Sequence, residues 1–495
     1  MDITNKRELE LHNRNHIDIS GFTKDQIKAY EELIGFINGS FDSKDYKRAL
    51  LGAAGTGKTY LVKALIANCN LSYSTIGLAA PTHKACAVLE SSIGLAKVHI
   101  NTLASDFGLK PNFDASKFDI NNPPFDQKGR IKVKEYMLYI IDEASMIPNK
   151  SKMGNTKGFK DFIESICVQN QCKIIYIGDP LQLPPVGESY SSAFHNIKKC
   201  ELFEIVRQEK DNPITQLLQM LRYDIEHKTF TCLNYISKNR YKFDDNNIKG
   251  YEVCNLETFK DKVYTNFNDP QLMTDVDYCK IVAYTNLHVS GWNKYVRYST
   301  IIDSDKSIVT KNDLFLSNIT ITDIFNNRVI TNSENYIVND VVNYIHPKYG
   351  LKGFLVKFQA ILGGKISQPL FVLDHSDVEN VRQYITISDK LVELAKTANV
   401  KLRGERWKSY YEFKESCLLL IDITKNNKLL YARNIDYGFA LTAHKSQGST
   451  FDTVFVDVKD IVYDSKGVVW ADIDGINRRL YVAISRAKNK VYLNF

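Results

Sequence analysis

The sequence predicts an α/β protein in which two domains are built on parallel sheets and each domain carries an insertion. Three short segments of the first half are apolar at consecutive positions: IGLAA (76–80), LYII (138–141) and IIYI (174–177). Such runs are typical of strands that helices cover on both faces of a sheet. The pattern then returns in KIVAY (280–284), TVFVDV (453–458) and VYLNF (491–495). We therefore expect two α/β domains.

Two stretches interrupt this rhythm. Residues 301–428 are rich in Asn, Asp, Thr and Ile, with strand-like pieces at 336–342 and 354–358 and a charged, helical stretch at 389–414. They predict a β-rich insertion in the second domain. A smaller insertion, 106–132, has turn-forming prolines and glycine in the first domain. The predicted boundaries are a flexible lead-in at 1–20, a first domain at 21–200, and a second at 201–300 with 429–495.

Composition narrows the class of protein. The chain has 495 residues, 44% hydrophobic and 24% charged, which is usual for a folded globular protein. No apolar run approaches the roughly 18 residues of a membrane helix, and the polar N-terminus is unlike a signal peptide. Nine scattered cysteines without a C-x-x-C pair indicate free buried thiols in a reducing compartment, so we expect a cytoplasmic protein. A net charge of +7 permits a polyanionic partner.

The first predicted element is a helix over 23–37, with its apolar residues on one face. Thr23 and Gln26 have the spacing of a capping box, in which each side chain bonds the backbone N–H of the other residue.

The next strand runs into the segment LLGAAGTGKT, residues 50–59, which fits the pattern G-x-x-x-x-G-K-T. In such a loop, Gly52, Gly55 and Gly57 let backbone N–H groups point at phosphates, and Lys58 reaches the β- and γ-phosphates. Thr59 offers a hydroxyl to Mg²⁺. The positive N-terminus of the following helix faces the same anion. The sequence therefore predicts nucleotide binding.

Two further strand ends carry polar residues suited to ATP hydrolysis. Asp142 and Glu143 follow the strand at 138–141; Asp142 would hold Mg²⁺ together with Thr59, and Glu143 would polarise the attacking water. The segment IGDPLQLPP (177–185) ends the next strand. A Gln or Asp there can hydrogen-bond the γ-phosphate or its water, and Gln182 could sense hydrolysis.

The motifs taken in order resemble those of superfamily 1 DNA helicases. They are GAAGTGKT, AAPTHKA, IIDEAS, IGDPLQLPP, TAHKSQGST and YVAISRA. The resemblance runs from about residue 20 to 495, is strongest to the RecD-like branch that includes the phage Dda helicase, and is weakest in the two insertions. It implies two RecA-like P-loop domains, a β-hairpin pin at 106–132 and a β-barrel-like domain with an arm at 301–428.

The resemblance also implies roles in the ATP site. Gln26 matches a glutamine that reads adenine, a role compatible with the capping box, and Tyr60 is expected beside the nucleotide. Arg207 and Arg486 match two arginine fingers that reach the γ-phosphate. Such fingers are worth about 10³–10⁵ in rate. Two residues, Gln447 and Gly448, resemble a motif that couples the ATP state to DNA.

The DNA-binding residues are implied in the same way. Two polar, basic loops at strand ends resemble grips on the DNA backbone, which carry no base readout. They are Pro81, Thr82, His83 and Lys84 in the first domain, and Thr442, His444 and Lys445 in the second. The segment 284–286 matches a family signature whose role stays open. Relatives commonly carry T-I-H after the first grip; here Asn101 stands in HINTL, so that histidine's role is not carried over.

The insertions bear the remaining candidates. Pro111 and Phe125 fall near positions where Dda-like enzymes place a proline and an aromatic ring against DNA bases. The ring of Phe125 could stack on a base, or pack on its own hairpin. Four aromatic residues of the arm could brace the pin or form a self-contained cluster: Trp407, Tyr410, Tyr411 and Phe413.

Together these features predict a monomeric ATP-dependent helicase that uses ATP and Mg²⁺, moves 5′ to 3′ on single-stranded DNA and opens a fork, with a single-strand-binding protein or other replication protein as a partner. Polarity comes from the resemblance alone. Two alternatives stay open: a DNA-stimulated ATPase that strips proteins from DNA, and a non-motor P-loop enzyme.

Overall fold

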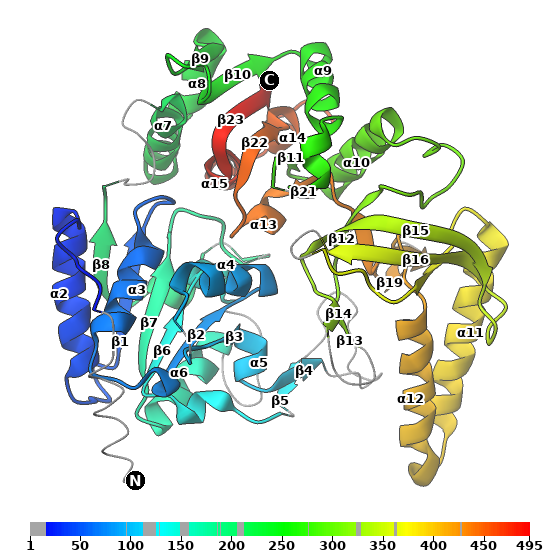
Figure 1. Ribbon diagram of the computed structural model, residues 1–495, viewed down its shortest axis with the longest axis horizontal. Helices are drawn as coiled ribbons and strands as arrows, with labels where there is room; N and C mark the ends of the chain where they lie inside the picture. Colours follow the sequence, from blue (N-terminus) through cyan, green and yellow to red (C-terminus); the bar gives the residue numbers. More distant parts are fainter. Residues whose placement is uncertain are drawn as a thin grey trace. The chain divides into compact units, whose positions relative to one another are not determined.

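The computed structural model describes residues 16–95, 97–111, 125–127, 129–148, 158–185, 187–188, 190–204, 212–275, 277–322, 328–360, 364–425 and 428–495. The chain folds into two compact units. Figure 1 shows the helices and strands with colours that follow the sequence. Unit 1 comprises Met1–Val253, Ser446–Thr450 and Val462–Val491, and unit 2 comprises Cys254–Lys445, Phe451–Ile461 and Tyr492–Phe495. The domain boundaries expected from the sequence stay a prediction.

A six-stranded sheet forms the centre of unit 1, with the strand order β3-β2-β6-β7-β1-β8. All neighbouring strands are parallel. The bounds are β1 Lys47–Gly52, β2 Ile76–Ala80, β3 His99–Thr102, β6 Leu138–Ile141, β7 Lys173–Gly178 and β8 Lys198–Leu202. The predicted parallel sheet of the first domain is confirmed.

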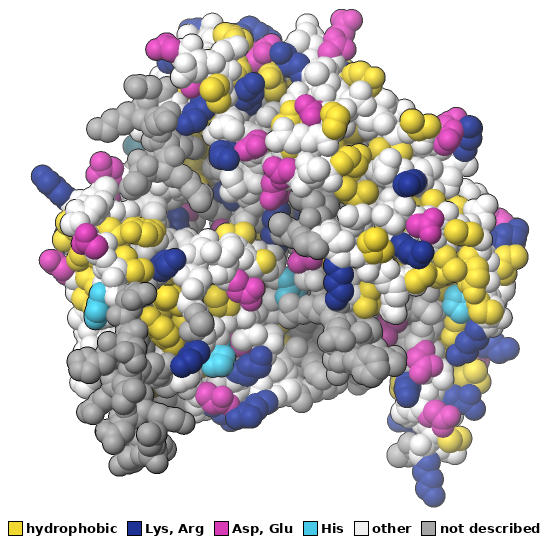
Figure 2. All heavy atoms as spheres, in the orientation of Figure 1, with side chains coloured by type: hydrophobic (Ala, Val, Ile, Leu, Met, Phe, Trp, Pro, Cys, Tyr) yellow, Lys and Arg dark blue, Asp and Glu magenta, His cyan; other side chains and the backbone are white. Residues whose placement is uncertain are grey.

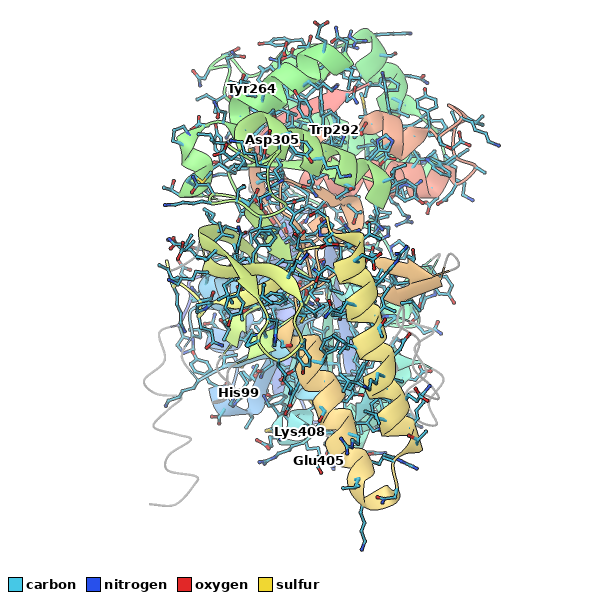
Figure 3. All side chains as sticks on the ribbon, turned by 90° about the vertical axis from the view of Figure 1, so that its right-hand side faces the viewer. His99, Tyr264, Trp292, Asp305, Glu405 and Lys408 are labelled. Atoms are coloured by element: carbon cyan, nitrogen blue, oxygen red, sulfur yellow. The ribbon has the colours of Figure 1, made fainter. Side chains whose placement is uncertain are left out.

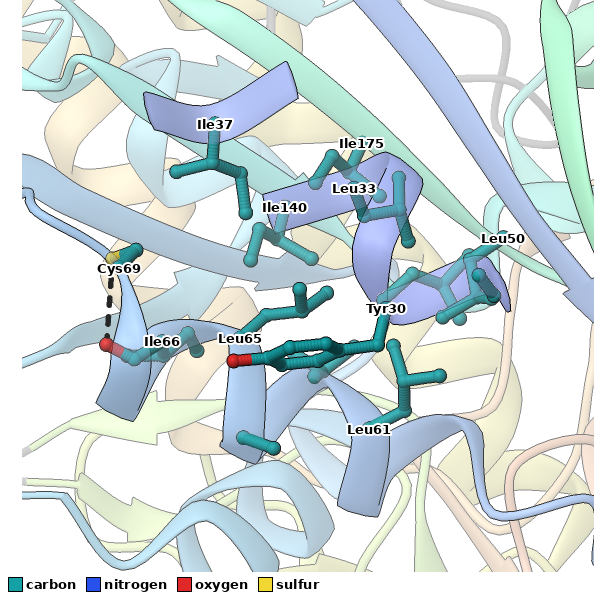
Figure 4. Close-up of a cluster of buried hydrophobic side chains, with 14 of the residues drawn as sticks. Tyr30, Leu33, Ile37, Leu50, Leu61, Leu65, Ile66, Cys69, Ile140 and Ile175 are labelled. Atoms are coloured by element: carbon teal, nitrogen blue, oxygen red, sulfur yellow. Dashed lines mark hydrogen bonds between the residues drawn. The ribbon is translucent and has the colours of Figure 1, made fainter. Parts of the chain in front are cut away.

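Helices cover both faces of this sheet. On one face, α2 (Lys24–Asn38) and α3 (Lys58–Asn68) pack their apolar side chains against the strands. Figure 4 shows Tyr30, Leu33, Leu61 and Leu65 from these helices beside Leu50, Ile140 and Ile175 from the strands. The other face is covered by α5 (Leu103–Asp106), η2 (Lys132–Glu135) and α6 (Phe159–Gln169). Because both faces are buried, the strands are apolar at consecutive positions.

Unit 1 also contains further helices and a strand pair. The bounds are η1 Tyr73–Thr75, α4 His83–Ile93, η3 Ala144–Met146, η4 Ser192–Phe194, α7 Pro213–His227, α8 Thr231–Lys238 and α15 Ile473–Ser485, with an antiparallel pair β9 Tyr241–Phe243 and β10 Gly250–Cys254. Buried Asn477 ties α15 to the end of α7, because its Nδ2 donates to the carbonyls of Asp224 at 3.2 Å and Thr229 at 2.9 Å.

A short antiparallel pair lies in the small insertion of unit 1. Strands β4 (Leu109–Pro111) and β5 (Phe125–Gln127) pair so that Pro111 lies opposite Phe125. This agrees with the expected hairpin. Residues 112–124 lie outside the described residues, as do the side chains of Pro111 and Phe125, so the two alternatives for the Phe125 ring stay open.

Asp106 lies at the base of this insertion with a fully buried side chain. The Tyr139 hydroxyl donates to its Oδ2 at 3.1 Å, whereas its Oδ1 has no partner among the described residues. Burial raises the pKa of Asp106 to about 6, and the hydrogen bond from Tyr139, the charge of Lys132 and the side chain of Asn101 oppose the shift. The folded protein therefore holds this proton more tightly than the unfolded chain does.

Asp106→Asn is expected to stabilise the protein at pH 8 and to do so less at pH 5. The proton's contribution to the free energy of unfolding is complete below about pH 4 and is lost as the pH rises through about 6. The loss amounts to about 3 kcal/mol. Asparagine does not titrate, so the variant does not lose this stability. Thermal melting of variant and wild type at both pH values tests this. Glu226→Gln, on the surface of α7, is the control. A Tm difference that does not change with pH would show that Asp106 titrates like an exposed carboxyl.

Unit 2 contains parallel strands of its own. Strand β11 (Cys279–Ala283) lies between β21 (Ala440–Thr442) and β22 (Phe451–Val456) and is parallel to both. The core here includes Phe259, Trp292 and Phe455. The remaining elements of this part are α9 Leu256–Phe267, η5 Pro270–Met273, α10 Asn286–Thr300, α13 Ala443–Ser446 and α14 Val458–Val462. Strand β23 (Ala487–Asn494) belongs to unit 1 as far as Val491 and to unit 2 from Tyr492. The second α/β pattern is confirmed.

The turn from β11 into α10 is held by Asp460. Its Oδ2 accepts the backbone N–H groups of Tyr284 and Thr285 at 2.7 Å each, and its Oδ1 accepts the Thr285 hydroxyl at 2.8 Å. Trp292, which Figure 3 labels on α10, donates its Nε1 to Asp457 at 2.7 Å. The family signature at 284–286 therefore forms a helix start that a buried carboxylate satisfies.

The large insertion is β-rich, as expected. An antiparallel sheet has the order β17-β16-β15-β12-β20. The bounds are β12 Leu314–Ser317, β15 Asn335–Ile345, β16 Lys352–Ala360, β17 Leu370–Leu373 and β20 Ile435–Tyr437, with small pairs β13 Ile321–Thr322 and β14 Arg328–Ile330, and β18 Ile423–Lys425 and β19 Lys428–Tyr431.

The arm of this insertion consists of two helices, α11 (Val378–Thr397) and α12 (Val400–Ser416), which lie side by side (Figures 1 and 3). The sequence predicted one helical stretch at 389–414. The chain breaks there because Asn399 caps α12, its side chain accepting the Leu402 N–H at 3.1 Å. Charged side chains of both signs cover the arm, including Glu405 and Lys408 (Figures 2 and 3).

The arm aromatics favour the alternative of a self-contained cluster. Phe413 is fully buried between Tyr349 and Tyr384. Tyr410 is also buried, and its ring contacts Trp407 and Tyr411. Phe413 therefore has no surface with which to brace another element.

All nine cysteines are free and buried, as the sequence indicated. Within the described ranges, no helix combines the length and apolar character needed to span a membrane.

Candidate ATP-hydrolysis site

The phosphate loop lies at the carboxyl end of β1, between Gly52 and the start of α3. Gly55 and Gly57 have φ values of +84° and +78°, a backbone region that favours glycine. A Cβ at Gly57 would also lie 2.5 Å from Gln26 Nε2. The Lys58 ammonium donates to the carbonyls of Gly52 and Ala53, both at 2.8 Å. The loop is thus curled around the lysine, and the predicted contacts of its N–H groups and of Lys58 with phosphates stay a prediction.

Gln26 bonds both its own helix cap and the phosphate loop. Its Oε1 accepts the Thr23 N–H at 3.0 Å, which completes the predicted capping box. Its Nε2 donates to the Thr56 carbonyl at 2.9 Å, and the side chain is 3% exposed. The start of α2 is therefore fixed to the loop. Tyr60, by contrast, is 53% exposed, with its ring edge against Phe22.

The acidic pair follows β6 at the same edge of the sheet. Glu143 N–H donates to Asp142 Oδ1 at 2.9 Å, and Glu143 has left-handed backbone angles, with φ +49°. Such a conformation is uncommon for a residue with a side chain. Burial raises the pKa of Glu143 to about 7, and the charge of Asp142 adds to the shift while Arg486 opposes it. Burial also raises the pKa of Asp142.

Thr59 and Asp142 line the same small cavity beneath the loop. A hydroxyl and a carboxylate are oxygen ligands of the kind that Mg²⁺ takes alongside phosphate oxygens and water. The two residues that the sequence proposed for Mg²⁺ are therefore brought together, and their chemistry fits the ion.

The loop after β7 carries Asp179 and Gln182. Gln182 is 5% exposed, and its Oε1 has no partner among the described residues. Asp179 is fully buried and accepts hydrogen bonds from Leu181 N–H, the Arg222 guanidinium and the Tyr481 hydroxyl. Because protein groups surround its carboxylate, Asp179 is unsuited to the γ-phosphate role that the sequence left open for it. Gln182 keeps that role as a prediction.

The coupling motif and one arginine finger lie in unit 1 with this site. Gln447 Nε2 donates to the Leu183 carbonyl at 3.1 Å, and a Cβ on Gly448 would lie 3.9 Å from Glu143 Oε1. Arg486 is 4% exposed and donates to the Ser449 carbonyl at 3.2 Å. Burial lowers the pKa of Arg486, and the Glu143 charge opposes the shift. The second predicted finger, Arg207, lies outside the described residues.

The predicted DNA grips lie at strand ends in both units. In unit 1, Pro81 to Lys84 follow β2 and are partly exposed; Thr82 caps α4, accepting Ala85 N–H at 3.2 Å. His83 and Lys84 begin that helix. Thr82 is therefore a helix cap as well as a DNA candidate.

In unit 2, Thr442 ends β21, and His444 and Lys445 lie on the short helix α13. Thr442 Oγ1 accepts Lys445 N–H at 3.3 Å, and the Lys445 ammonium donates to Asn318 Oδ1 at 2.9 Å. The lysine therefore joins the strand end to the β-rich insertion.

Three residues around the site were missed by the sequence: Arg222, Arg478 and Tyr481. Arg222 lies on α7, and the other two lie on α15 just before Arg486. The helix period would have placed Arg478 and Tyr481 on one face, three residues apart. Nothing in the pattern indicated that this face meets the loop after β7.

Two family models match the chain. A model of the AAA domain matches residues 24–236, and a model of the UvrD-like helicase C-terminal domain matches residues 437–494. These ranges contain the phosphate loop, the acidic pair, the coupling motif and Arg486. They carry every described residue of the site.

Relatives with similar sequences come from distant sources. An uncharacterised protein of Acanthamoeba polyphaga mimivirus is 25% identical over 512 residues, covering 95% of this chain and 98% of the relative. An uncharacterised protein of Methanocaldococcus jannaschii is 23% identical over 90% of this chain and 36% of its own length. A conjugal transfer protein TraA of Agrobacterium fabrum is 28% identical, covering 36% of this chain and 14% of the relative.

Among solved structures, similarity is found to Pif1 helicases. The enzyme from Candida albicans is 18% identical, with a TM-score of 0.43 over 96% of this chain and 94% of the other. The enzyme from Bacteroides, in complex with ADP-AlF3 and single-stranded DNA, is 16% identical, with a TM-score of 0.48 over 95% and 92%.

The identification rests on the two family models and on the motifs whose residues gather at one edge of the sheet. A helicase C-terminal model is not expected of a nucleotide kinase or signalling ATPase, so the non-motor alternative is disfavoured. Particular likeness to the phage Dda helicase stays a prediction. The two family models and the motifs together support an ATP-dependent DNA helicase of superfamily 1.

Proposed function

We propose that this helicase moves 5′ to 3′ along single-stranded DNA and opens the duplex at a fork, driven by ATP hydrolysis at the site of unit 1. The observation that carries the proposal is the placement of Gln447 and Gly448. Gln447 donates to the Leu183 carbonyl, and Gly448 lies next to the Glu143 carboxylate. The motif expected to report on DNA therefore lies beside the carboxylate expected to act in ATP hydrolysis.

Each charged group of the site then has a chemical task. Lys58 would hold the β- and γ-phosphates, for which it must leave the carbonyls of Gly52 and Ala53. Glu143 would accept a proton from the attacking water, and its raised pKa suits a general base working near neutral pH. Arg486 would neutralise charge that develops on the γ-phosphate. Gln26 would read the adenine edge, for which its amide must leave the Thr23 N–H or the Thr56 carbonyl.

Mg²⁺ would be held by Thr59 and Asp142. When bound, the ion supplies positive charge to the phosphate oxygens. The task of this chain is to place Thr59, which carries a hydroxyl, and Asp142, which carries a carboxylate, at the same cavity. Asp142 also fixes the backbone of Glu143 through the 2.9 Å hydrogen bond.

The DNA track would follow the two polar loops at strand ends, Pro81–Lys84 and Thr442–Lys445. Their hydroxyl, imidazole and ammonium groups suit phosphate oxygens better than base edges. Separating one base-pair step costs on the order of 1.4 kcal/mol of stacking, a small load for one ATP. We further propose that the enzyme acts as a monomer in the cytoplasm, with a single-strand-binding protein or other replication protein as a partner.

A second candidate function is a motor that strips proteins from DNA with little unwinding. The antiparallel pair of β4 and β5 favours unwinding, because a hairpin of this kind can act as a wedge at a fork. Strand separation distinguishes the two functions.

Partial duplexes with a single-stranded tail test both the function and the direction. The full chain with ATP and Mg²⁺ is expected to release the short strand from a duplex with a 5′ tail and to leave a matched duplex with a 3′ tail intact. ATP turnover with each tail alone is the control, because both single strands should stimulate it.

Release from the 3′ tail only would overturn the proposed direction. Stimulated ATP turnover without release from either duplex would favour the protein-stripping alternative. Turnover that neither tail stimulates would contradict the coupling between the motif at 447–448 and DNA.

A further inference from the structure

The loop after β7 is held within unit 1 by a network of two buried residues, Asp179 and Tyr481, and the partly exposed Arg222. The Arg222 guanidinium Nη1 donates to both carboxylate oxygens of Asp179, at 3.2 and 3.0 Å, and to the Tyr481 hydroxyl oxygen at 2.8 Å. The Tyr481 hydroxyl in turn donates to Asp179 Oδ2 at 2.6 Å. Asp179 and Tyr481 are no more than 1% exposed, so water does not satisfy these groups.

A second grip lies one turn earlier on α15. Arg478 Nη1 donates to the carbonyls of Pro180 at 2.7 Å and Gln182 at 3.0 Å. Its Nε is fixed by Asp474 at 2.6 Å. One face of α15 therefore bonds three of the four residues from 179 to 182.

The ends of this linkage are two groups of the ATP site. At one end is Gln182, whose backbone the linkage holds and whose Oε1 has no partner in the described part of the chain. At the other end is Arg486, which follows directly after α15. Five residues of helix, about 7.5 Å of rise, join Tyr481 to Arg486. A helix this short is stiff, so moving Arg486 also strains the bonds to Asp179.

We propose that Arg222, Asp179 and Tyr481 form a latch that positions Gln182 and Arg486 for hydrolysis. The three are positioning residues and need not touch ATP themselves. The proposal rests on the roles proposed above for Gln182 and Arg486. The proposal has a distinguishing kinetic consequence. Without the latch, ATP still binds, because the phosphate loop contains none of the three latch residues. The hydrolysis step, by contrast, becomes slower.

Tyr481→Phe is the decisive variant, because it keeps the buried ring and removes only the hydroxyl. It is expected to lower the kcat of DNA-stimulated ATP turnover about tenfold, since the hydroxyl's two hydrogen bonds to charged groups, Arg222 and Asp179, are lost, while the KM for ATP stays within about twofold. Tyr223→Phe, on the exposed side of α7 next to Arg222, is the matched control and should behave as wild type.

Arg222→Gln extends the test to the charged partner, and thermal melting of each variant reports on folding. It is expected to lower kcat at least as much as Tyr481→Phe does, and the double variant should be little worse than Arg222→Gln, because both changes open one latch. If Arg222→Gln does not fold, Tyr481→Phe alone decides. Unchanged kcat in a folded Tyr481→Phe, or a rise in KM alone, would overturn the latch.

Arg486→Ala separates this proposal from the one on which it rests. If Arg486→Ala lowers kcat and masks the effect of Tyr481→Phe, both proposals are supported. If Arg486→Ala leaves kcat intact while Tyr481→Phe lowers it, the finger role fails and the latch acts through Gln182. If Arg486→Ala lowers kcat and Tyr481→Phe does not, the finger role stands and the latch is wrong.

Discussion

Replacing Lys58 with alanine is expected to lower ATP turnover by at least about 10²-fold, the usual effect of removing one strong donor to the reacting charge. Lys58 is the only lysine whose ammonium lies within the described phosphate loop, where it donates to the carbonyls of Gly52 and Ala53. Unwinding should be lost in parallel, because no other group of the described site supplies its charge to the β- and γ-phosphates. Steady-state turnover with saturating single-stranded DNA measures the effect.

Lys28→Ala is the control for this change, because Lys28 is exposed on α2 of the same unit. It should leave turnover and unwinding unaltered. A Lys58→Ala enzyme that hydrolyses ATP within a few-fold of wild type would mean that the γ-phosphate lies elsewhere. Melting curves of both variants confirm that they are folded.

Changing Glu143 to glutamine is expected to lower kcat by about 10²–10⁴, the range that a general base contributes, while ATP still binds. Glutamine has the same length and tolerates the left-handed backbone no worse than glutamate does. Asp142 keeps its place as the proposed Mg²⁺ ligand. Equilibrium binding of a fluorescent ATP analogue, set beside single-turnover hydrolysis, separates affinity from chemistry.

For Glu143→Gln, Glu31→Gln on the exposed side of α2 is the matched control. Loss of nucleotide affinity together with turnover would place Glu143 in binding. Near-normal turnover would remove its assignment as the base, and Asp142 would then be the carboxylate to test.

The phosphate loop and the acidic pair could be predicted because each is local. Gly55 and Gly57 have positive φ values, which favour glycine. Lys58 and Asp142 follow strands whose continuous apolar residues predict a parallel sheet. Carboxyl ends of neighbouring parallel strands meet at one edge, so local motifs were enough to bring Thr59 and Asp142 together.

The latch could not be predicted, because its members are far apart in sequence. Asp179, Arg222 and Tyr481 meet only after α7 and α15 have packed, and buried Asn477 fixes that packing. By its position after the strand, Asp179 is as well suited to bind the γ-phosphate as Gln182. Only its hydrogen bonds to Arg222 and Tyr481 exclude that role. Asn399 is a local signal for the break between α11 and α12. Helix-forming residues on both sides of it nevertheless favoured one continuous helix in the sequence prediction.

The buried carboxylate at the start of α10 has a consequence for nucleotide stoichiometry. The turn after β11, like the phosphate loop after β1, presents backbone N–H groups at the end of a parallel strand. After β11 those N–H groups are already neutralised by Asp460, an anion that belongs to the chain and never leaves. After β1 the corresponding anion must come from solution. The N–H groups of the turn after β11 are thus already bonded within the chain, so we expect ATP at the loop after β1 and not at this turn.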